Sequence, residues 1–446
     1  MLHMLISTQG LNSPKGHDKM KAEKIKINKE QFAFVTEEEK ERDDTRASLT
    51  YWADAWRRLK KNRLAMLGLI GVILVILFGV VGPYAFKASY SDQRNEFKNI
   101  GPILDVYEID EGLFAYVSKD YNFFIIDEDG RNLEYVERIK AEAVLEGRSN
   151  FGEILSPAQI KAQREAQEVV NFNYYQYKDE EITVDYSYKL LPPEEAVDFE
   201  LEITYKDNVI RYPAKKVLNK AYPFGTDSLG RDLLIRVMYG ARISLLVAFI
   251  ATLVNFLIGV VYGAISGYEG GTTDNVMMRI VDVINSVPLV LYIILLMVMI
   301  DSQGGLGTII ITLGTVYWVG MARLVRGQIL SLKEQEFVLA ARALGVSTIK
   351  IIFKHLIPNA MGPIIVSMTM MIPSAIFTES FLSFIGLGVS APQASWGTLA
   401  NNALSGILTY PYQLFFPALA IALTMLSFNF LGDGLRDALD PRLRKG

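Results

Sequence analysis

Long apolar runs alternate with short polar connections over most of the chain. Runs with few or no charges occupy roughly residues 64–81, 243–265, 286–300, 309–322, 362–385 and 414–430. Most approach the length that a helix needs to cross the hydrocarbon of a bilayer. The pattern predicts an all-α polytopic membrane protein with about six transmembrane helices.

Charge decides the expected orientation of these spans. The stretch Trp52–Arg63 is aromatic and basic, and it directly precedes the first apolar run. Basic residues favour the cytoplasmic side, and tryptophans favour the membrane interface. We therefore expect an interfacial elbow helix, a first span that starts in the cytoplasm, and both termini on that side.

The same patterns divide the chain into segments. The predicted organisation is a polar cytoplasmic tail (1–50), the elbow and first span (51–85), an extracytoplasmic insert (86–222), a five-helix core (223–435) whose cytoplasmic loop is 323–358, and a cytoplasmic tail (436–446).

The insert differs from the rest of the chain because acidic residues clearly outnumber basic ones and tyrosines are frequent. The runs Glu181–Lys189 and Phe199–Tyr205 alternate with the period of a strand, whereas Pro157–Val170 has the pattern of a helix. These patterns predict an inserted α+β domain on the far side of the membrane. It would either brace the protein or dock a partner.

A charged segment between two of the late apolar runs should lie outside the hydrocarbon. Its first part, from Glu336 onward, is rich in helix formers, and Gly345 stands where a left-handed residue would end the helix. The small side chains of Ala340 and Ala341 leave room for another surface to approach the backbone.

A second short helix is expected to follow, capped by Ser347 or Thr348 and ended by Pro358. The apolar residues of 349–353 would share one side of it. Together the two helices would form a helix-turn-helix knob that is presented to a partner.

This segment resembles the EAA loop of permease subunits of bacterial ABC importers. Ala340, Ala341, Gly345 and Pro358 fit the loop's pattern, while Leu339 stands in place of the usual glutamate and Glu336 lies one turn earlier. The resemblance implies that the knob docks in a groove of an ATPase subunit. Coupling would then depend on Ala340, Ala341 and Gly345, with Arg342 beside them.

A second signature precedes the second span. Thr226, Asp227 and Ser228 are expected to cap an interfacial helix that leads into the membrane. The spacing of Gly225, Thr226 and Asp227 from Gly230, Arg231 and Asp232 closely resembles the subfamily of ABC permeases for dipeptides, oligopeptides and nickel. The charged residues form either a local salt-bridge lattice or a gating or docking site.

Two more stretches resemble the same subfamily. Residues 378–397 contain Glu379 near the outer end of a predicted span and Trp396 in a Ser-Trp-Gly sequence, and residues 432–442 contain a Gly-Asp-Gly-Leu-Arg-Asp run. A carboxylate within a span either packs inside the bundle or lines the transport pathway. Both roles remain open for Glu379.

Composition argues against catalysis, metal binding and nucleotide binding by this chain. It has no cysteine and three histidines, and it lacks the Gly-rich phosphate loop that ends in Gly-Lys-Ser/Thr. We expect no catalytic residue, no metal site and no cofactor here. The resemblance implies that ATP and Mg²⁺ are bound by partner subunits.

The resemblance implies a permease subunit of an ATP-driven importer in the bacterial cytoplasmic membrane, with oligopeptides as substrates. Its partners would be a second homologous permease, two ATPases, an extracytoplasmic peptide-binding protein and the lipid bilayer, with no nucleic acid. Nickel or another small solute is the alternative substrate. A membrane receptor or scaffold that uses the insert, a proton-driven transporter and an intramembrane enzyme are the other classes considered.

Overall fold

The computed structural model describes residues 51–86, 89–139, 172–186, 188, 197–300, 306–389 and 393–440. The described residues from Asp54 onward belong to one compact unit. The predicted tail 1–50 and the predicted helix 157–170 lie outside the described residues, as do residues 441–446.

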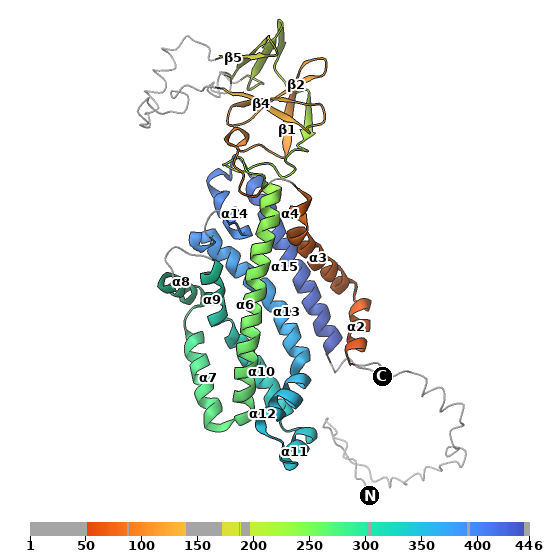
Figure 1. Cartoon of the computed structure of the whole chain (residues 1–446), viewed down its shortest axis with the longest axis vertical. Helices are drawn as coiled ribbons and strands as arrows, with labels where there is room; N and C mark the ends of the chain where they lie inside the picture. The colour runs from red at the N-terminus through yellow and green to blue at the C-terminus, as the bar shows by residue number, and fades with distance from the viewer. Residues whose placement is uncertain are drawn as a thin grey trace, which may run out of the picture. The chain divides into compact units, whose positions relative to one another are not determined.

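Helices form most of the described chain (Figure 1). Among the described residues, five helical segments are long and apolar enough to cross a membrane, and a bent helix pair adds a sixth if it counts as one span. The five segments are Arg63–Val80 (α3), Leu233–Glu269 (α6), Leu306–Leu332 (α9 and α10), Thr348–Leu387 (α12, α13 and two π-helical turns) and Tyr412–Leu439 (α15). The shorter helices are Tyr51–Lys61 (α2), Gly82–Ala85 (α4), Gly271–Ser286 (α7), Leu289–Ile300 (α8), Glu336–Ala343 (α11) and Trp396–Asn402 (α14).

The third expected span is the exception to the predicted set. Helix α8 has 12 residues, and it is bent by 88° from α7 across Pro288. A helix of that length rises about 18 Å, which is short of the roughly 30 Å of hydrocarbon. The proline offers no N–H, and its ring prevents a straight continuation from α7. Only the bent α7–α8 pair has the length of a span.

The second span starts differently from the prediction. Residues 226–228 do not cap it; Asp232 is the N-cap, and its Oδ1 accepts from the backbone N–H groups of Leu234 (2.8 Å) and Ile235 (3.3 Å). From there α6 runs as a single helix, with no separate interfacial helix before the membrane. The prediction placed the cap too early because several capping residues stand in a row.

Pro358 was expected to end the second helix of the knob, and that prediction is wrong. The helix continues from Thr348 through a π-helical turn (Ile351–Leu356) into α13, Ile357–Leu382. The N–H of Ile357 already bonds five residues back, to Ile352 O. Because the ladder has changed register there, Pro358 in the first turn of α13 removes no bond that the helix needs.

Close backbone contacts hold the spans together. Helix α6 packs on α10, and α3 packs on α15. A Cβ added to Gly68 of α3 would lie 2.6 Å from the carbonyl oxygen of Ser427 in α15. Only glycine permits this crossing distance. The last span, expected to end at Phe430, continues as α15 to Leu439.

The described part of the insert consists of β-strands. The first sheet has the strand order β4-β3-β2-β1-β9, and the second has the order β5-β6-β7-β8. The first is built from Leu133–Arg138, Asn122–Ile126, Leu113–Val117, Ile103–Asp110 and Lys215–Leu218, and the second from Phe172–Tyr177, Glu180–Asp185, Glu202–Tyr205 and Asn208–Ile210. The predicted strand patterns correspond to β6 and β7, and paired strands in both sheets are antiparallel.

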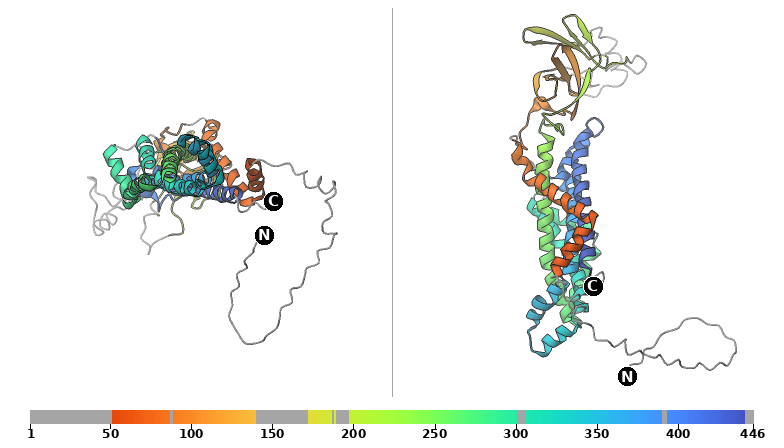
Figure 2. Two further views of the ribbon diagram at one scale, coloured as in Figure 1. Left: turned by 90° about the horizontal axis from the view of Figure 1, so that it is seen from below. Right: turned by 90° about the vertical axis from the view of Figure 1, so that its right-hand side faces the viewer.

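The two sheets share one apolar core. It includes Phe123 of β3, whose ring stacks on Tyr175 of β5 with centroids 4.8 Å apart. The β domain lies at one end of the spans, and α11 lies at the other (Figure 2).

Candidate functional site

The predicted knob is present at the end of the spans opposite the β domain. We call residues Glu336–Phe353 the knob. Helix α11 ends in a Schellman motif: Gly345 has φ +73°, its N–H bonds Arg342 O at 2.9 Å, and Val346 N–H bonds Ala341 O at 3.1 Å. The expected left-handed role of Gly345 is confirmed.

The knob is anchored on one side and apolar on the other. Val338, Ala341, Ile351 and Ile352 are buried in a core that also includes parts of α6, α10 and α13. The exposed apolar side chains are Phe337 (41 %), Leu339 (47 %), Leu344 (82 %), Ile349 (70 %) and Phe353 (52 %). Such an exposed apolar cluster at the end of the helical bundle is typical of a protein contact.

The details of the knob differ from the expectations in three ways. Ala341 is buried against the protein's own core, so of the predicted pair of alanines only Ala340 is exposed to a partner. Ser347 occupies the N-cap of α12, but its side chain makes no capping hydrogen bond. The residues of 349–353 do not share one side, because Ile351 and Ile352 point inward while the other two apolar side chains point outward.

Two charged candidates on α11 are exposed. Glu336 lies in the first turn of α11, where a negative carboxylate interacts favourably with the positive end of the helix dipole. The guanidinium of Arg342 lies over the ring of Tyr268, 4.8 Å from the centroid, and its Nε lies 3.3 Å from the Tyr268 hydroxyl oxygen. Arg342 therefore connects the knob to the end of α6.

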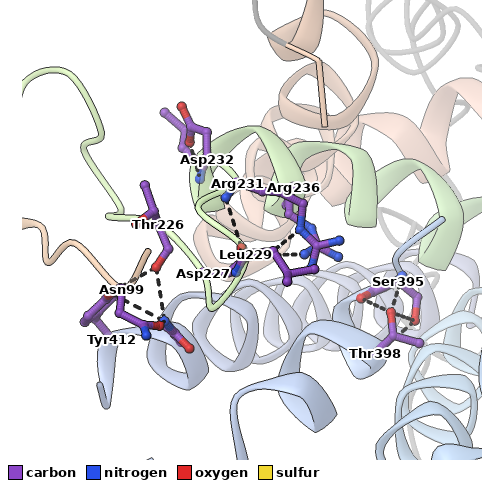
Figure 3. A network of polar contacts seen from close by, with 12 residues as sticks. Asn99, Thr226, Asp227, Leu229, Arg231, Asp232, Arg236, Ser395, Thr398 and Tyr412 are labelled. Carbon is purple, nitrogen blue, oxygen red and sulfur yellow. Dashed lines mark hydrogen bonds and ion pairs between the residues drawn. The ribbon is translucent and has the colours of Figure 1, made fainter. Parts of the chain in front are cut away.

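The second candidate group gathers at the start of α6, next to the β domain (Figure 3). Asp227 Oδ1 accepts from the N–H groups of Leu229 (2.9 Å) and Arg231 (3.0 Å). Its Oδ2 accepts from Arg231 Nε at 2.7 Å and from Arg236 Nη1. Gly225 and Gly230 have φ +77° and +71° and make the turns that bring these groups together.

Burial makes the Asp227 carboxylate important for folding. All three charged side chains in this cluster are at most 11 % exposed. Removing one partner of a buried ion pair typically costs 3–5 kcal/mol, because a charge remains without compensation. This geometry is that of a local salt-bridge lattice, and no gating motion is needed to explain it.

Thr226 connects three parts of the fold. Its hydroxyl accepts from Ile100 N–H (2.8 Å) and donates to Phe97 O (2.5 Å), so it joins the start of the β domain. Its carbonyl oxygen accepts from the hydroxyl of Tyr412 (2.9 Å) and from Gln413 Nε2 (3.1 Å) at the start of α15. The signature residue is thus a joint between the β domain and two spans.

Glu379 is enclosed rather than exposed. Its side chain is fully buried on α13, and its carboxylate accepts from the hydroxyls of Ser244 of α6 (2.9 Å) and Ser383 (2.8 Å). Trp396 contacts the same serine: its backbone N–H donates to Ser244 Oγ at 3.3 Å, and its Nε1–H donates to Val237 O at 2.9 Å. Together they join α6, α13 and α14.

Sequence reasoning missed one ion pair. Arg326 of α10 binds Asp274 of α7 through Nε and Nη2, both at 2.6 Å, and Ser266 of α6 donates to the same carboxylate. Asp274 is buried and therefore requires a cationic partner, but the sequence just before and after it, Gly-Gly-Thr-Thr-Asp-Asn, is polar and gives no such signal.

The fold is therefore that of a multi-pass helical membrane protein with a β domain at one end and an apolar knob at the other. The family described as "Binding-protein-dependent transport system inner membrane component" matches residues 259–445, and "N-terminal TM domain of oligopeptide transport permease C" matches residues 50–102. The chain belongs to this family of transport permeases.

Two permeases of similar sequence agree with this assignment. The chain is 38 % identical over 416 residues to the dipeptide transport system permease protein DppC of Bacillus subtilis, which covers 92 % of this chain and 93 % of that protein. It is 55 % identical over 232 residues to the oligopeptide transport system permease protein OppC of the same organism, covering 52 % and 75 %. For a solved structure of the inward-facing MetNI methionine ABC transporter, the TM-score is 0.37 at 20 % identity, with 47 % and 96 % covered.

Proposed function

We propose that this chain is the transmembrane permease subunit of an ATP-driven importer of oligopeptides. The observation that carries the proposal is the match to a dipeptide permease along 92 % of the chain, a length that requires most of the insert to be included. The chain would form half of the translocation pathway.

The partners follow from the same proposal. A second permease of similar fold would complete the pathway, two ATPase subunits would bind the knob, and a binding protein would deliver peptides to the β-domain end. ATP and Mg²⁺ would be held by the ATPases, so this chain would need no cofactor. Both termini and the knob would lie in the cytoplasm, and the β domain would lie outside.

The proposed coupling uses the continuity of the helices. Ile349 is exposed on the knob, yet it belongs to the same helical segment, Thr348–Leu387, that crosses the membrane. A displacement of the knob would therefore move α13 directly. Transport requires in addition that each nucleotide state of the ATPases binds the inward-open and outward-open states with different affinity.

The test is Leu344→Asp in the assembled transporter. This side chain is 82 % exposed, so the substitution should leave folding unchanged while placing a charge in the apolar contact. An unpaired polar group in such a contact costs about 1–3 kcal/mol, so uptake of a radiolabelled tripeptide should fall by a factor between about 5 and about 150. Co-purification of the ATPases should fall with it.

Leu218→Asp is the matched control, because Leu218 is 68 % exposed on β9 at the opposite end. It should transport normally. Equal uptake by the two variants would refute the coupling role of the knob. If cells took up nickel and no tripeptide through this chain, the peptide assignment would be wrong and the nickel alternative would replace it.

A further inference from the structure

A cleft of about 840 Å³ lies between the β domain and the loop that leads into α15. One wall comes from β1, β2, the residues just before and after them, residues 200–201 and Lys216 of β9, and the other comes from residues 408–412. Clefts of 300–1,000 Å³ are typical of small-molecule sites. Nothing in the coupling mechanism requires this cleft.

Tyrosines supply much of its lining. Tyr107 and Tyr116 reach it from the β domain, and Tyr410 and Tyr412 reach it from the loop. A tyrosine presents an apolar ring together with a hydroxyl that donates and accepts. Burial and the nearby carboxylates of Asp105 and Glu200 raise the pKa of Tyr107 to about 12, so its hydroxyl keeps its proton at neutral pH.

The charges that line the cleft are balanced. Asp105 and Glu200 supply two carboxylates, and Lys119 and Lys216 supply two ammonium groups. Lys216 Nζ lies 3.5 Å from Asp105 Oδ1, and both side chains are more than half exposed. An exposed pair of this kind contributes at most about 1 kcal/mol, so a ligand can exchange with it at little cost.

These features select a ligand with both charges and no large excess of either. A short peptide with free termini has an ammonium group at one end, a carboxylate at the other, and amides and side chains between them. Its ends match the lysines and carboxylates, and its middle matches the tyrosine rings. The hydroxyls of Tyr410 and Tyr412 already donate to Asp120 and Thr226, so toward a peptide they can only accept from amide N–H groups. A polyanion would require an excess of cations, which the lining does not provide.

We propose that this cleft is a binding site for short zwitterionic peptides on the permease itself. The inference rests on the proposed function, because that function supplies peptides at the β-domain end. The mouth carries Leu408 and Ile103, which are 96 % and 58 % exposed and are available to cover a bound side chain. The permease would then hold a peptide outside the membrane before it enters the pathway.

The test is photo-crosslinking in the assembled transporter, reconstituted in lipid nanodiscs without ATP and without the binding protein. The probe is an alanine tripeptide with free termini whose central residue is p-benzoylphenylalanine, and mass spectrometry locates the products. Crosslinks should fall within residues 99–121, 200–201, 216 and 408–412. Unlabelled trialanine should compete, whereas N-acetyl-trialanine amide should not.

Lys216→Glu and Lys220→Glu form the matched pair of variants. Both lysines are exposed and pair with an aspartate at 3.5 Å, but only Lys216 lines the cleft. In Lys216→Glu the peptide loses one charge-assisted contact, so the yield of crosslinked peptide should fall about tenfold relative to the unchanged protein. Lys220→Glu should behave like the unchanged protein.

Three results would overturn the proposal: crosslinks outside the cleft, equal competition by the capped peptide, or equal yields from the two variants. Crosslinking that appears only when the binding protein is added would identify the cleft as a docking surface for that protein instead. A second measurement distinguishes failure of the cleft site from failure of the proposed function. It is the ATP-dependent uptake of the tripeptide in proteoliposomes that contain the transporter and the binding protein. Uptake without specific cleft labelling refutes this site alone, whereas absence of uptake refutes the proposed function.

Discussion

At the scale of single residues, two aspartates near the start of α6 have different roles, although only five positions separate them in the sequence. Asp227 holds two arginine side chains, and its charge is compensated. Asp232 caps the helix and receives only backbone N–H groups from Leu234 and Ile235. Burial therefore acts on Asp232 without the opposing effect of a cation. The consequence is a pH dependence that belongs to this one carboxyl.

We predict that Asp232→Asn stabilises the protein at neutral pH. Burial raises the pKa of Asp232 from 3.8 to about 6, so between these values the folded protein holds a proton that the unfolded chain releases. The stability contributed by this group is therefore highest below about pH 4, falls as the pH rises to about 6, and is constant above. Asparagine caps as well as aspartate and carries no charge.

The melting temperature of the purified protein checks this. Relative to the unchanged protein, the variant should gain on the order of 1–3 kcal/mol at pH 7–8 and nothing near pH 4. Asp198→Asn, at an exposed position, is the control. A gain that is the same at every pH, or that increases on acidification, would show that the carboxyl is not responsible.

At the scale of elements, prediction succeeded where local chemistry sets a boundary. Gly345 ends α11 with the expected left-handed conformation, and the elbow helix was recognised from its basic and aromatic residues. It failed where a choice depends on distant contacts. Thr226 has the chemistry of a helix cap, but its hydroxyl is taken by Ile100 and Phe97, more than a hundred positions away.

The same limit applies to the candidate site. The helix-turn-helix knob was predicted from sequence. Its exposed apolar surface was not, because which residues point outward depends on the packing of α6, α10 and α13. The tyrosine-lined cleft could not be foreseen at all. Its walls come from residues 99–121, 200–216 and 408–412, and no local pattern indicates that these ranges meet.

The crossing of α3 and α15 leads to a prediction about glycine. In a helix, Gly→Ala normally stabilises by up to about 1 kcal/mol. At Gly68 the sign should reverse, because the new methyl group would lie 2.6 Å from Ser427 O and 2.7 Å from Leu431 N, and backbone atoms cannot move aside individually. We expect Gly68→Ala to destabilise by about 1–3 kcal/mol, the usual cost of overpacking.

Gly327→Ala is the matched control, since nothing lies within 4 Å of a Cβ at that position of α10. Its melting temperature should be equal to that of the unchanged protein or higher. The two variants compared in the same detergent provide the measurement. If Gly68→Ala were also neutral or stabilising, the helices would not cross as closely as described.

At the scale of the whole molecule, the β domain is tied to the spans by polar contacts at the start of α15. Tyr410 OH donates to Asp120 Oδ1 at 2.7 Å, and Lys119 Nζ donates to Thr409 O at 3.0 Å. Asn99 joins the same group by donating to Asp120 Oδ2 at 2.6 Å. A displacement that begins at the knob and moves the spans would therefore reach the β domain.

This arrangement predicts that Tyr410→Phe loosens the attachment of the β domain without unfolding it. The substitution removes one hydrogen bond to a carboxylate, worth about 1.5–3 kcal/mol, and keeps the ring. Amide hydrogen exchange of residues 93–100 and 118–122 should become about tenfold faster or more. Exchange in the core strands β3 and β6 should not change, because the two-sheet core does not include Tyr410.

Tyr212→Phe serves as the control, because Tyr212 is 56 % exposed and lies on the β domain away from the joint. If the amides of residues 93–100 and 118–122 exchange at the same rate in both variants, the Tyr410 hydroxyl does not hold the β domain to the spans. Because Tyr410 also lines the cleft, its variant should lose peptide crosslinking as well. Suppose that amide exchange at residues 93–100 and 118–122 becomes faster in Tyr410→Phe while peptide crosslinking is undiminished. The peptide site would then need only the β domain and not residues 408–412.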